Sequence, residues 1–341
     1  MVKMKDVATA TGLALSTVSE ILRGKGGYNT ATVELVHATA KRLDYRPNPI
    51  SLALNGQKTR TIGLFVTSWV TSYSVNRRVE GLLESAAEEN YLIYTAYARF
   101  SNPDYINEYT SVVKDLISRR VDGFVFYGTI PKETKTVLNQ SGLPYVMFGD
   151  VNEGITGAQI DRTAGIKQAA CHLAELGHRE AGLFVTASYD GKPSKKVEIY
   201  KKYLKMYGIR PIIQPEWEIP FVEDLDALIY ERVRALAKCG KFPTAFLMNN
   251  DEFTYPALAA FRDAGVRVPQ DVSIIGFDNH PGSSYCFPPL TTIAVPHKEV
   301  GKSAFQLLKG MIDAPPATRT SKIIKIKTNL VIRQSTDTPR Q

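Results

Sequence analysis

Polar side chains follow several short apolar segments in the later part of the chain, where together they could bind a small molecule. They are Asp150 after Tyr145–Phe148, Asp161 after Gln159-Ile160, Asn250-Asp251 after Leu247-Met248, and Asp278 after Ile275-Gly276-Phe277. If the segments are parallel strands, their carboxyl ends meet at one edge of a sheet, where ligands bind in such folds. Carboxylates and amides with aromatic side chains nearby suit a polyhydroxylated ligand. Taken singly, each residue is also common as a helix N-cap or a loop residue.

The elements that would position these residues alternate in type from Thr61 onward. The predicted strands are Ile62–Val66, Leu92–Ala96, Gly123–Tyr127, Tyr145–Phe148, Ala181–Val185, Ala245–Met248, Val272–Phe277 and Thr291–Val295. The predicted helices are 76–90, 104–119, 163–176, 195–207, 224–239, 253–264 and 297–312. This alternation predicts an α/β body with parallel sheets covered by helices on both faces, and the body is long enough for two such sheets.

An enzyme could use the same carboxylates as an acid–base pair, but other signatures of catalysis are missing from the sequence. There is no G-x-S-x-G elbow and no P-loop, and the five histidines are scattered. The three cysteines, Cys171, Cys239 and Cys286, have the spacing of neither a disulfide framework nor a zinc site. We therefore expect no catalytic residues, no metal and no cofactor.

Positive charge is concentrated at the start of the chain. The formal net charge is +8, and residues 1–60 carry nine Lys or Arg against four Asp or Glu. A basic segment on a nearly balanced chain suggests contact with a polyanion. No stretch is apolar enough for a membrane helix, and the first residues lack the hydrophobic run of a signal peptide. We therefore expect a cytoplasmic protein without a membrane partner.

Three helical periodicities fill this basic segment. In the first predicted helix, one face carries Met4, Val7, Ala8 and Thr11, and Gly12 ends the helix. In the second, that face carries Val18, Ile21 and Leu22, and Gly24 ends the helix. In the third, it carries Val33, Val36, Ala40 and Leu43. Two short helices joined by a tight turn and braced by a third form the helix-turn-helix pattern, whose second helix enters the major groove of DNA. At about 100° per residue, the side of the second helix opposite Val18 carries Ser16, Ser19, Glu20 and Arg23. These side chains are candidates to contact phosphates and base edges.

A further short helix is predicted after the third one. Asn48 is a good N-cap, Pro49 suits the first helical position and Gly56 is a natural stop. The segment between them is too short to hold as an isolated helix, so it should fold only when its apolar face is buried.

These motifs resemble the LacI/GalR family of bacterial transcription regulators. The matching stretches include Lys5-Asp6-Val7-Ala8, Ser16-Thr17-Val18-Ser19, Leu43-Asp44-Tyr45-Arg46-Pro47-Asn48, Val268–Asp278, Pro288–Thr292 and Leu330–Thr336. The resemblance covers essentially the whole chain. It implies a helix-turn-helix head over 1–47, a hinge helix and linker over 48–60, and a periplasmic-binding-protein-like body over 61–341.

The resemblance also implies how the body is divided and which residues bind ligands. Subdomain one is expected over about 61–161 plus 292–322, and subdomain two over about 162–291 plus 323–341, with crossings near 161, 291 and 322. The residues expected at DNA are Leu15, Ser16, Thr17, Ser19, Glu20, Arg23, Asn48 and Leu54. The residues expected at the effector are Tyr73, Asp161, Ser194, Phe221, Asn250 and Asp278. Leu54 matches the leucine that wedges into the minor groove, and the alternative for Leu54 and for Phe221 is simple core packing.

Three departures from the family pattern bear on specificity. Glu20 stands where an arginine is usual, and it either shifts the base preference, since it can only accept hydrogen bonds, or faces solvent. Ala14 stands where a serine N-cap is common, so the second helix is capped later by Ser16 or is less stable by ~1 kcal/mol. Ser194 replaces an arginine that grips the effector, and Lys192, Lys195 or Lys196 could substitute for it.

The function implied is that of a sequence-specific DNA-binding transcription regulator, a repressor controlled by a sugar or related metabolite bound between the body subdomains. Its expected partners are palindromic operator DNA, the effector and a second copy of the chain. The alternative is a sequence-indifferent, architectural DNA-binding protein with a vestigial ligand-binding body. The sequence leaves open whether the effector induces or co-represses.

Overall fold

We describe the protein from a computed structural model, which covers residues 2–24, 26–45, 58–66, 72–97, 105–186, 195–219 and 225–340. Four of the expected site residues, Asn48, Leu54, Ser194 and Phe221, lie outside these described residues, as does most of the expected hinge.

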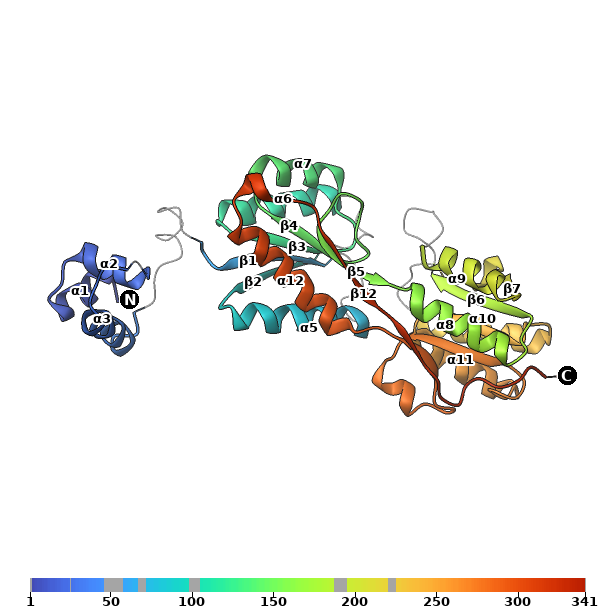
Figure 1. The fold of residues 1–341 in the computed structure, drawn as a ribbon. Helices are drawn as coiled ribbons and strands as arrows, with labels where there is room; N and C mark the ends of the chain where they lie inside the picture. Colours follow the sequence, from blue (N-terminus) through green and yellow to red (C-terminus); the bar gives the residue numbers. More distant parts are fainter. Residues whose placement is uncertain are drawn as a thin grey trace.

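The head is a bundle of three helices, drawn in blue in Figure 1: α1 Met4–Thr11, α2 Leu15–Leu22 and α3 Thr30–Arg42. Gly12 ends α1 in the left-handed conformation, with φ of +69°, which a glycine adopts without strain. The side chain of Asn29 caps α3 by accepting from the backbone N–H of Thr32. Val7, Val18 and Val36, one from each helix, are fully buried in the bundle core. The predicted helix-turn-helix arrangement is therefore present.

The structure excludes one of the two alternatives for the start of α2 and corrects one expectation about its exposed face. The helix begins at Leu15, so Ser16 does not cap it, and Ala14 occupies the N-cap position without a side-chain hydrogen bond. Ser19 is buried and accepts a hydrogen bond from the guanidinium of Arg23, so it does not belong to the exposed face. The physical reason is that α2 packs against both α1 and α3, which widens its buried arc to include the position next to Val18.

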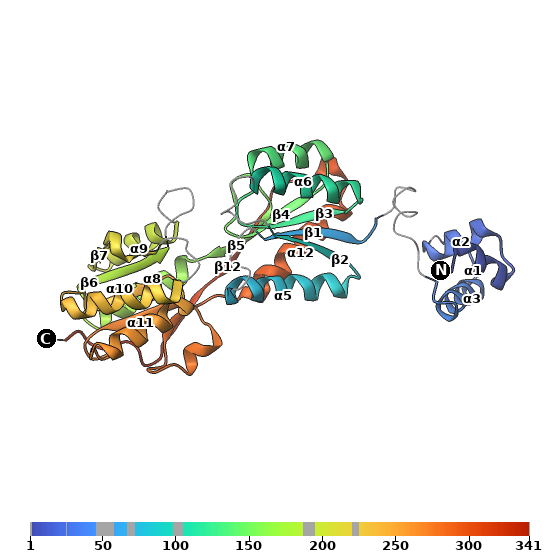
Figure 2. The same ribbon diagram turned by 180° about the vertical axis from the view of Figure 1, so that it is seen from behind.

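Subdomain one is built on a six-stranded parallel sheet with the order β12-β5-β4-β3-β1-β2. Its strands are β1 Thr61–Val66, β2 Leu92–Tyr97, β3 Gly123–Tyr127, β4 Tyr145–Gly149, β5 Gly157–Asp161 and β12 Ile323–Lys327. Its helices are α5 Tyr73–Glu88, α6 Tyr105–Ser118, α7 Lys132–Ser141 and α12 His297–Asp313. Figures 1 and 2 show α6 and α7 over one face of the sheet and α5 with α12 over the other.

Subdomain two is built on a second sheet with the order β13-β11-β10-β9-β6-β7, in which only β13 is antiparallel to its neighbour and β8 pairs with β6. Its strands are β6 Glu180–Thr186, β7 Arg210–Ile212, β8 Glu218–Ile219, β9 Ala245–Met248, β10 Ser273–Asp278, β11 Thr291–Ala294 and β13 Asn329–Val331. Its helices are α8 Thr163–Glu175, α9 Lys195–Met206, α10 Leu225–Cys239 and α11 Asp251–Asp263, and Figure 2 shows α10 and α11 on the same side of the sheet. Short 3-10 helices lie at Pro215–Trp217 and Pro281–Ser284, and a third, at Pro316–Thr318, belongs to subdomain one.

All predicted strands and helices of the body are present, within a few residues of their expected ends. Helix α7 and strands β7, β8, β12 and β13 were not predicted, and of β5 only the end at Gln159-Ile160 was anticipated. Their local patterns are weak, because α7 carries few apolar residues, β7, β8 and β13 have only two or three residues, and β12 alternates isoleucine with lysine.

The chain crosses between the subdomains three times, and two of the expected crossings are misplaced. The first crossing, after Asp161, lies where it was expected. Strand β11 pairs with β10 in subdomain two, so the second crossing lies at Val295-Pro296 and not near 291. Strand β12 pairs with β5 in subdomain one, so the third crossing lies at Thr328 and not near 322. An apolar strand shows by its pattern that it is buried, but not in which sheet.

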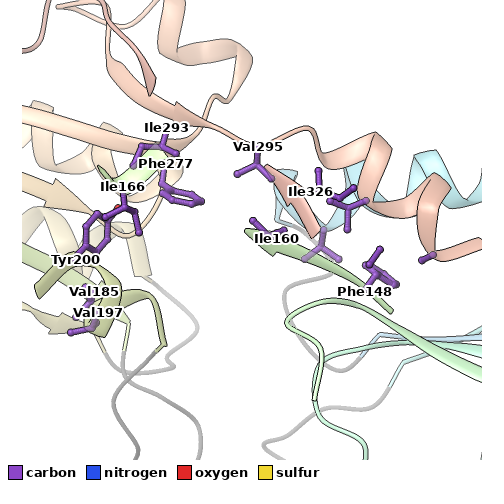
Figure 3. Close-up of a cluster of buried hydrophobic side chains, with 14 of the residues drawn as sticks. Phe148, Ile160, Ile166, Val185, Val197, Tyr200, Phe277, Ile293, Val295 and Ile326 are labelled. Atoms are coloured by element: carbon purple, nitrogen blue, oxygen red, sulfur yellow. The ribbon is translucent and has the colours of Figure 1, made fainter. Parts of the chain in front are cut away.

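Thr328 ties the first and third crossings together. Its hydroxyl donates to the backbone oxygen of Asp161 at 2.9 Å and accepts from the N–H of Gly165 at 3.1 Å. Figure 3 shows Phe148, Ile160 and Ile326 gathered on the subdomain-one side, Ile166, Tyr200, Phe277 and Ile293 on the other side, and Val295 between the two groups. The hydrophobic cores therefore continue up to the crossings from both sides.

Two glycines, one on each helix, allow the backbones of α5 and α12 to come into direct contact. A Cβ atom on Gly81 would lie 2.1 Å from the carbonyl oxygen of Lys298, and one on Gly301 would lie 1.8 Å from that of Arg78. Neither distance leaves room for a methyl group. The two helices therefore form a rigid pair beside the crossings.

Candidate ligand-binding cleft and DNA-binding head

A cavity of about 670 Å³ lies between the two subdomains, at the carboxyl ends of their strands. The polar residues in its wall come from both sides and include Arg78, Asp150, Arg162, Lys196, Asn250, Glu252 and Asp278. Tyr127, Phe253, Tyr255 and Phe277 add aromatic surface. A cavity of this size suits a small molecule, and its position follows the rule for ligand sites in parallel sheets.

An arginine–carboxylate pair forms one part of the wall. Arg162 donates from both terminal nitrogens to the two oxygens of Asp150, at 2.6 and 3.1 Å. Partial desolvation in the cleft opposes ionisation of Asp150, but the Arg162 guanidinium, with Arg78 and Lys195, outweighs it and lowers the pKa of this carboxyl. The pair therefore presents a fixed charge of each sign to a ligand.

Lys196, at the start of α9, is buried in the wall. Its ammonium lies 3.7 Å from the centre of the Phe277 ring and donates to the backbone oxygen of Asn249. Burial lowers the pKa of Lys196 to about 7, against the opposing effect of nearby aspartates, Asp278 first among them. Of the lysines considered as substitutes for the missing arginine, Lys196 lies in the cavity wall and Lys195 does not, while Lys192 lies outside the described residues.

Asp278 ends β10 and reaches across to subdomain one. Its carboxylate lies 3.3 Å from Nε2 of His297, the first residue of α12, whose Nδ1 accepts a 3.1 Å hydrogen bond from Nε of Arg78 on α5. Burial opposes ionisation of Asp278, but His297, Lys196 and Arg78 together outweigh it and lower the pKa of the carboxyl. This row of side chains therefore links both subdomains beside the cavity.

Asn250 and Asp251, which are adjacent at the start of α11, have different roles. Asn250 lines the cavity and caps α11 by accepting from the N–H of Phe253 at 2.9 Å. Asp251 is fully buried and accepts from Thr292, Ser283 and the backbone N–H of His280, at 2.6 to 2.7 Å. Burial raises the pKa of Asp251 to about 7 despite these donors. Asp251 therefore organises the loop behind the cleft.

Two residues expected at the effector are not among those that line the cavity. Tyr73 packs its ring edge-on against His280 and His297, with centroid distances of 4.5 and 5.9 Å. Asp161 uses its carboxylate to accept from the N–H of Thr163 at 3.0 Å at the first crossing. Asn250 and Asp278 both line the cavity, and their contact with an effector stays a prediction.

The exposed side of the head carries most of the residues expected at DNA. Leu15, Ser16 and Arg23 are exposed, while Thr17 and Glu20 are half-buried. The Tyr28 hydroxyl donates to the Glu20 carboxylate, so Glu20 is held by a neighbour and is not a simple solvent-facing side chain.

Two family models match the chain. The model for bacterial regulatory proteins of the lacI family matches residues 3–48, and the model for a periplasmic binding protein-like domain matches residues 170–336. The chain belongs to the LacI family.

Curated relatives align with this LacI-family protein over nearly its full length. The HTH-type transcriptional repressor PurR of Histophilus somni is 29% identical over 346 residues, covering 99% of this chain and 100% of the relative. Catabolite control protein A of Priestia megaterium is 27% identical over 343 residues, covering 98% and 99%.

Solved structures share the fold. A lac repressor dimer bound to operator and the anti-inducer ONPF has a TM-score of 0.80 at 23% identity, covering 98% of this chain and 99% of that one. A complex of the transcriptional regulator CelR with cellobiose has a TM-score of 0.68 at 23% identity, covering 98% and 100%. No helix in the described part of this LacI-family chain is both long and apolar enough to span a membrane.

Sequence reasoning missed several cleft residues of this LacI-family protein. Arg162 directly follows the strand end at Asp161, so the strand-end rule could have found it had it been applied to basic residues. Arg78 and Glu252 lie on amphipathic helices, and His297, which contacts Asp278 but does not itself line the cavity, begins one after a crossing. No local pattern distinguishes those three from ordinary surface or capping residues.

Proposed function

We propose that this protein is a sequence-specific transcriptional repressor whose binding to operator DNA is controlled by a small metabolite in the cleft. The observation that carries the proposal is the joining of a helix-turn-helix head to a body whose cavity is lined from both subdomains by charged and polar side chains. The PurR relatives, which are named as transcriptional repressors and align with 98–99% of this chain, support the proposal.

The wall of the cleft fits a polyhydroxylated, carbohydrate-like ligand. Arg162 and Lys196 donate hydrogen bonds, while Asp150, Asn250 and Asp278 accept them. A sugar hydroxyl does both, and the apolar face of a sugar ring stacks on aromatic side chains such as Tyr127. The CelR structure holds cellobiose in the same fold, which supports a ligand of this class.

We propose that the cleft binds this ligand without converting it. An acid–base pair needs one carboxyl whose pKa is raised so that it carries a proton at neutral pH. The pKa values of Asp150 and Asp278 are both lowered by their basic neighbours. Asp251, whose pKa is raised to about 7, is fully buried behind the wall and does not line the cavity.

Control of DNA binding follows from linkage between the two sites. The protein acts as a homodimer that presents two heads to a palindromic operator, as the operator-bound dimer of the lac repressor supports. A ligand that favours one placement of the subdomains shifts the dimer toward or away from the arrangement that the operator selects. The sign of the effect depends on which placement the operator-bound dimer adopts.

The experiment is a thermal-shift screen of sugars, sugar acids and nucleobases, followed by operator binding with each hit. The operator is first selected from random DNA by the purified full-length protein. A hit should shift the unfolding midpoint and change operator affinity, and both effects should be lost in Asp278→Ala but kept in Asp263→Ala, an exposed acid on α11. No hit from the panel, or a hit that leaves operator affinity unchanged, would contradict control by such a ligand.

The alternative function, sequence-indifferent DNA binding, is tested in the same preparation. The selected palindrome competes against bulk DNA at moderate salt, where non-specific binding weakens steeply. Preferential retention of the palindrome supports the repressor. Equal retention of both DNAs would overturn it in favour of an architectural protein.

A further inference from the structure

Three buried side chains from three separate elements form a row beside the cleft. Asp278 is the last residue of β10 in subdomain two, His297 is the first residue of α12, and Arg78 lies on α5 in subdomain one. Their exposed fractions are 9%, 4% and 6%. Nε of Arg78 lies 3.1 Å from Nδ1 of His297, and Nε2 of His297 lies 3.3 Å from Oδ1 of Asp278. The imidazole is thus placed between the two charged groups.

The chemistry of the row fixes the proton on His297. The guanidinium of Arg78 can only donate, so Nδ1 of His297 must accept and is therefore unprotonated. The proton of the neutral ring then lies on Nε2, on the side of Asp278. Burial lowers the pKa of His297, and Arg78 adds to this effect, while Asp278 opposes it. Other groups near the row are the ring of Tyr73 from α5, and Lys196, Arg162 and Asp251, which interact electrostatically with Asp278.

Both ends of the row are held in place. Asp278 has a φ of +101°, a region that residues with a side chain rarely adopt, so the surrounding structure must impose it. On the other side, Arg78 and His297 belong to the helix pair α5 and α12, which the close contacts at Gly81 and Gly301 make rigid. A ligand that displaces the Asp278 carboxylate therefore acts on the imidazole and not on a loose side chain.

We propose that His297 is a positioning residue that aims the Asp278 carboxylate into the cleft and couples it to Arg78 on the opposite subdomain. The part of this inference that concerns a ligand rests on the proposed function, because it assumes that the effector contacts Asp278. The coupling itself belongs to the folded chain and needs neither effector nor DNA.

The first test determines which ring nitrogen of His297 carries the proton. Full-length protein with labelled histidines is titrated by NMR, and the His297 signals are assigned by their loss in His297→Gln. We expect the Nε2-protonated ring, with a titration midpoint that rises in Arg78→Met and falls further in Asp278→Asn. A ring protonated on Nδ1, or a midpoint that neither substitution changes, would overturn the proposal.

The second test measures coupling between the two ends of the row. The unfolding midpoints of Arg78→Met, Asp278→Asn and the double variant form a cycle, and we expect a departure from additivity of about 2 °C or more. The cycle is repeated with His297→Gln, whose amide can also accept and donate, and with His297→Leu, which can do neither. Coupling should survive with glutamine and shrink with leucine, leaving only the direct attraction of the charges.

Matched substitutions complete the design. Arg77→Met, at the neighbouring position on α5, where the side chain pairs with Glu80, should add to Asp278→Asn without coupling. Equal coupling in the leucine and glutamine backgrounds would overturn the role of His297. Neither test uses operator or effector. The results can therefore be interpreted even if the DNA experiments contradict the proposed function.

Discussion

The carboxylate of Glu252, on α11 of subdomain two, accepts a 3.2 Å hydrogen bond from the backbone N–H of Tyr73, the first residue of α5 in subdomain one. The Ser72 hydroxyl donates to the other carboxylate oxygen at 3.1 Å. A negative charge at a helix N-terminus is favoured by the unpaired N–H groups and the helix dipole. One side chain of subdomain two therefore caps a helix of subdomain one across the mouth of the cleft.

Replacing Glu252 by alanine should loosen the closed arrangement of the subdomains. Loss of a charged cap costs about 1 kcal/mol, and we expect a lower unfolding midpoint with a larger radius of gyration by small-angle scattering of the ligand-free protein. Glu153→Ala, at an exposed acid between β4 and β5, serves as the control and should change neither quantity. An unchanged radius in Glu252→Ala would argue against the cap as a closing contact.

The contact between α5 and α12 should tolerate no methyl group at Gly81. The added Cβ would meet the carbonyl oxygen of Lys298 at 2.1 Å, so we expect Gly81→Ala to destabilise the protein by about 2 kcal/mol or more. Gly310→Ala is a matched control on α12, because nothing lies within 4 Å of its Cβ position. That variant should be neutral or more stable by up to about 1 kcal/mol. Denaturant unfolding compares the two, and similar losses of stability would rule out the backbone contact as the cause.

Lys196 should give the stability of the protein a dependence on pH at and above neutrality. Its pKa in the folded protein is about 7, against an ordinary 10.5, so between these values the unfolded chain binds more protons. Stability therefore rises with pH across this window, and the cost of burying the charge is greatest below it. Lys196→Met removes that cost.

We expect Lys196→Met to gain stability over the unsubstituted protein, and to gain more at about pH 6.5 than at about pH 9.5. Unfolding midpoints at the two pH values measure the difference. Lys205→Met, at an exposed position on the same helix, controls for loss of a positive charge and should show no such trend. A gain that is the same at both pH values would show that Lys196 is not the titrating group.

Glu20 should read a base in the operator half-site. It lies on the second helix of the helix-turn-helix and is held by the Tyr28 hydroxyl, which fixes the direction of an acceptor-only group. We expect Glu20→Arg to change the preferred base at one symmetric pair of half-site positions in a binding selection. Glu34→Arg, on an exposed face of α3, adds the same charge and should raise affinity without changing preference. The same preferred sequence in both variants would assign Glu20 no part in reading DNA.

Strand-end positions of the cleft were predictable from sequence, because the apolar strand before Asn250 and the one that ends in Asp278 show by their local pattern that they are buried and where they end. Arg78 was not, since it reaches the same cavity only through the order in which the chain crosses between the sheets. Asp161 was expected in the cleft, but its carboxylate binds the backbone of the first crossing. That contact depends on where the crossing turns, which the sequence pattern does not reveal.

The head shows the same limit at shorter range. Periodicity placed α1, α2 and α3 and identified Gly12 as a stop, because these are local effects. Ser19 is buried because α2 packs against both α1 and α3. A helical wheel drawn for α2 alone shows one apolar face and does not show that a second helix covers the position beside it. Asn48, Leu54, Ser194 and Phe221 lie outside the described residues, so their assigned roles stay predictions.

The three crossings also determine how the body can move. Thr328 joins the first and third crossings into one strap, and Val295-Pro296 forms a second strap beside it. Two subdomains connected at two separate places can rotate relative to each other easily about only one axis, the line through the two connections. Rotation about the other axes is resisted. Opening and closing of the cleft is then a single mechanical coordinate. A ligand that contacts both walls of the cleft would act on that coordinate, so a substitution that stiffens either connection should change how the ligand binds.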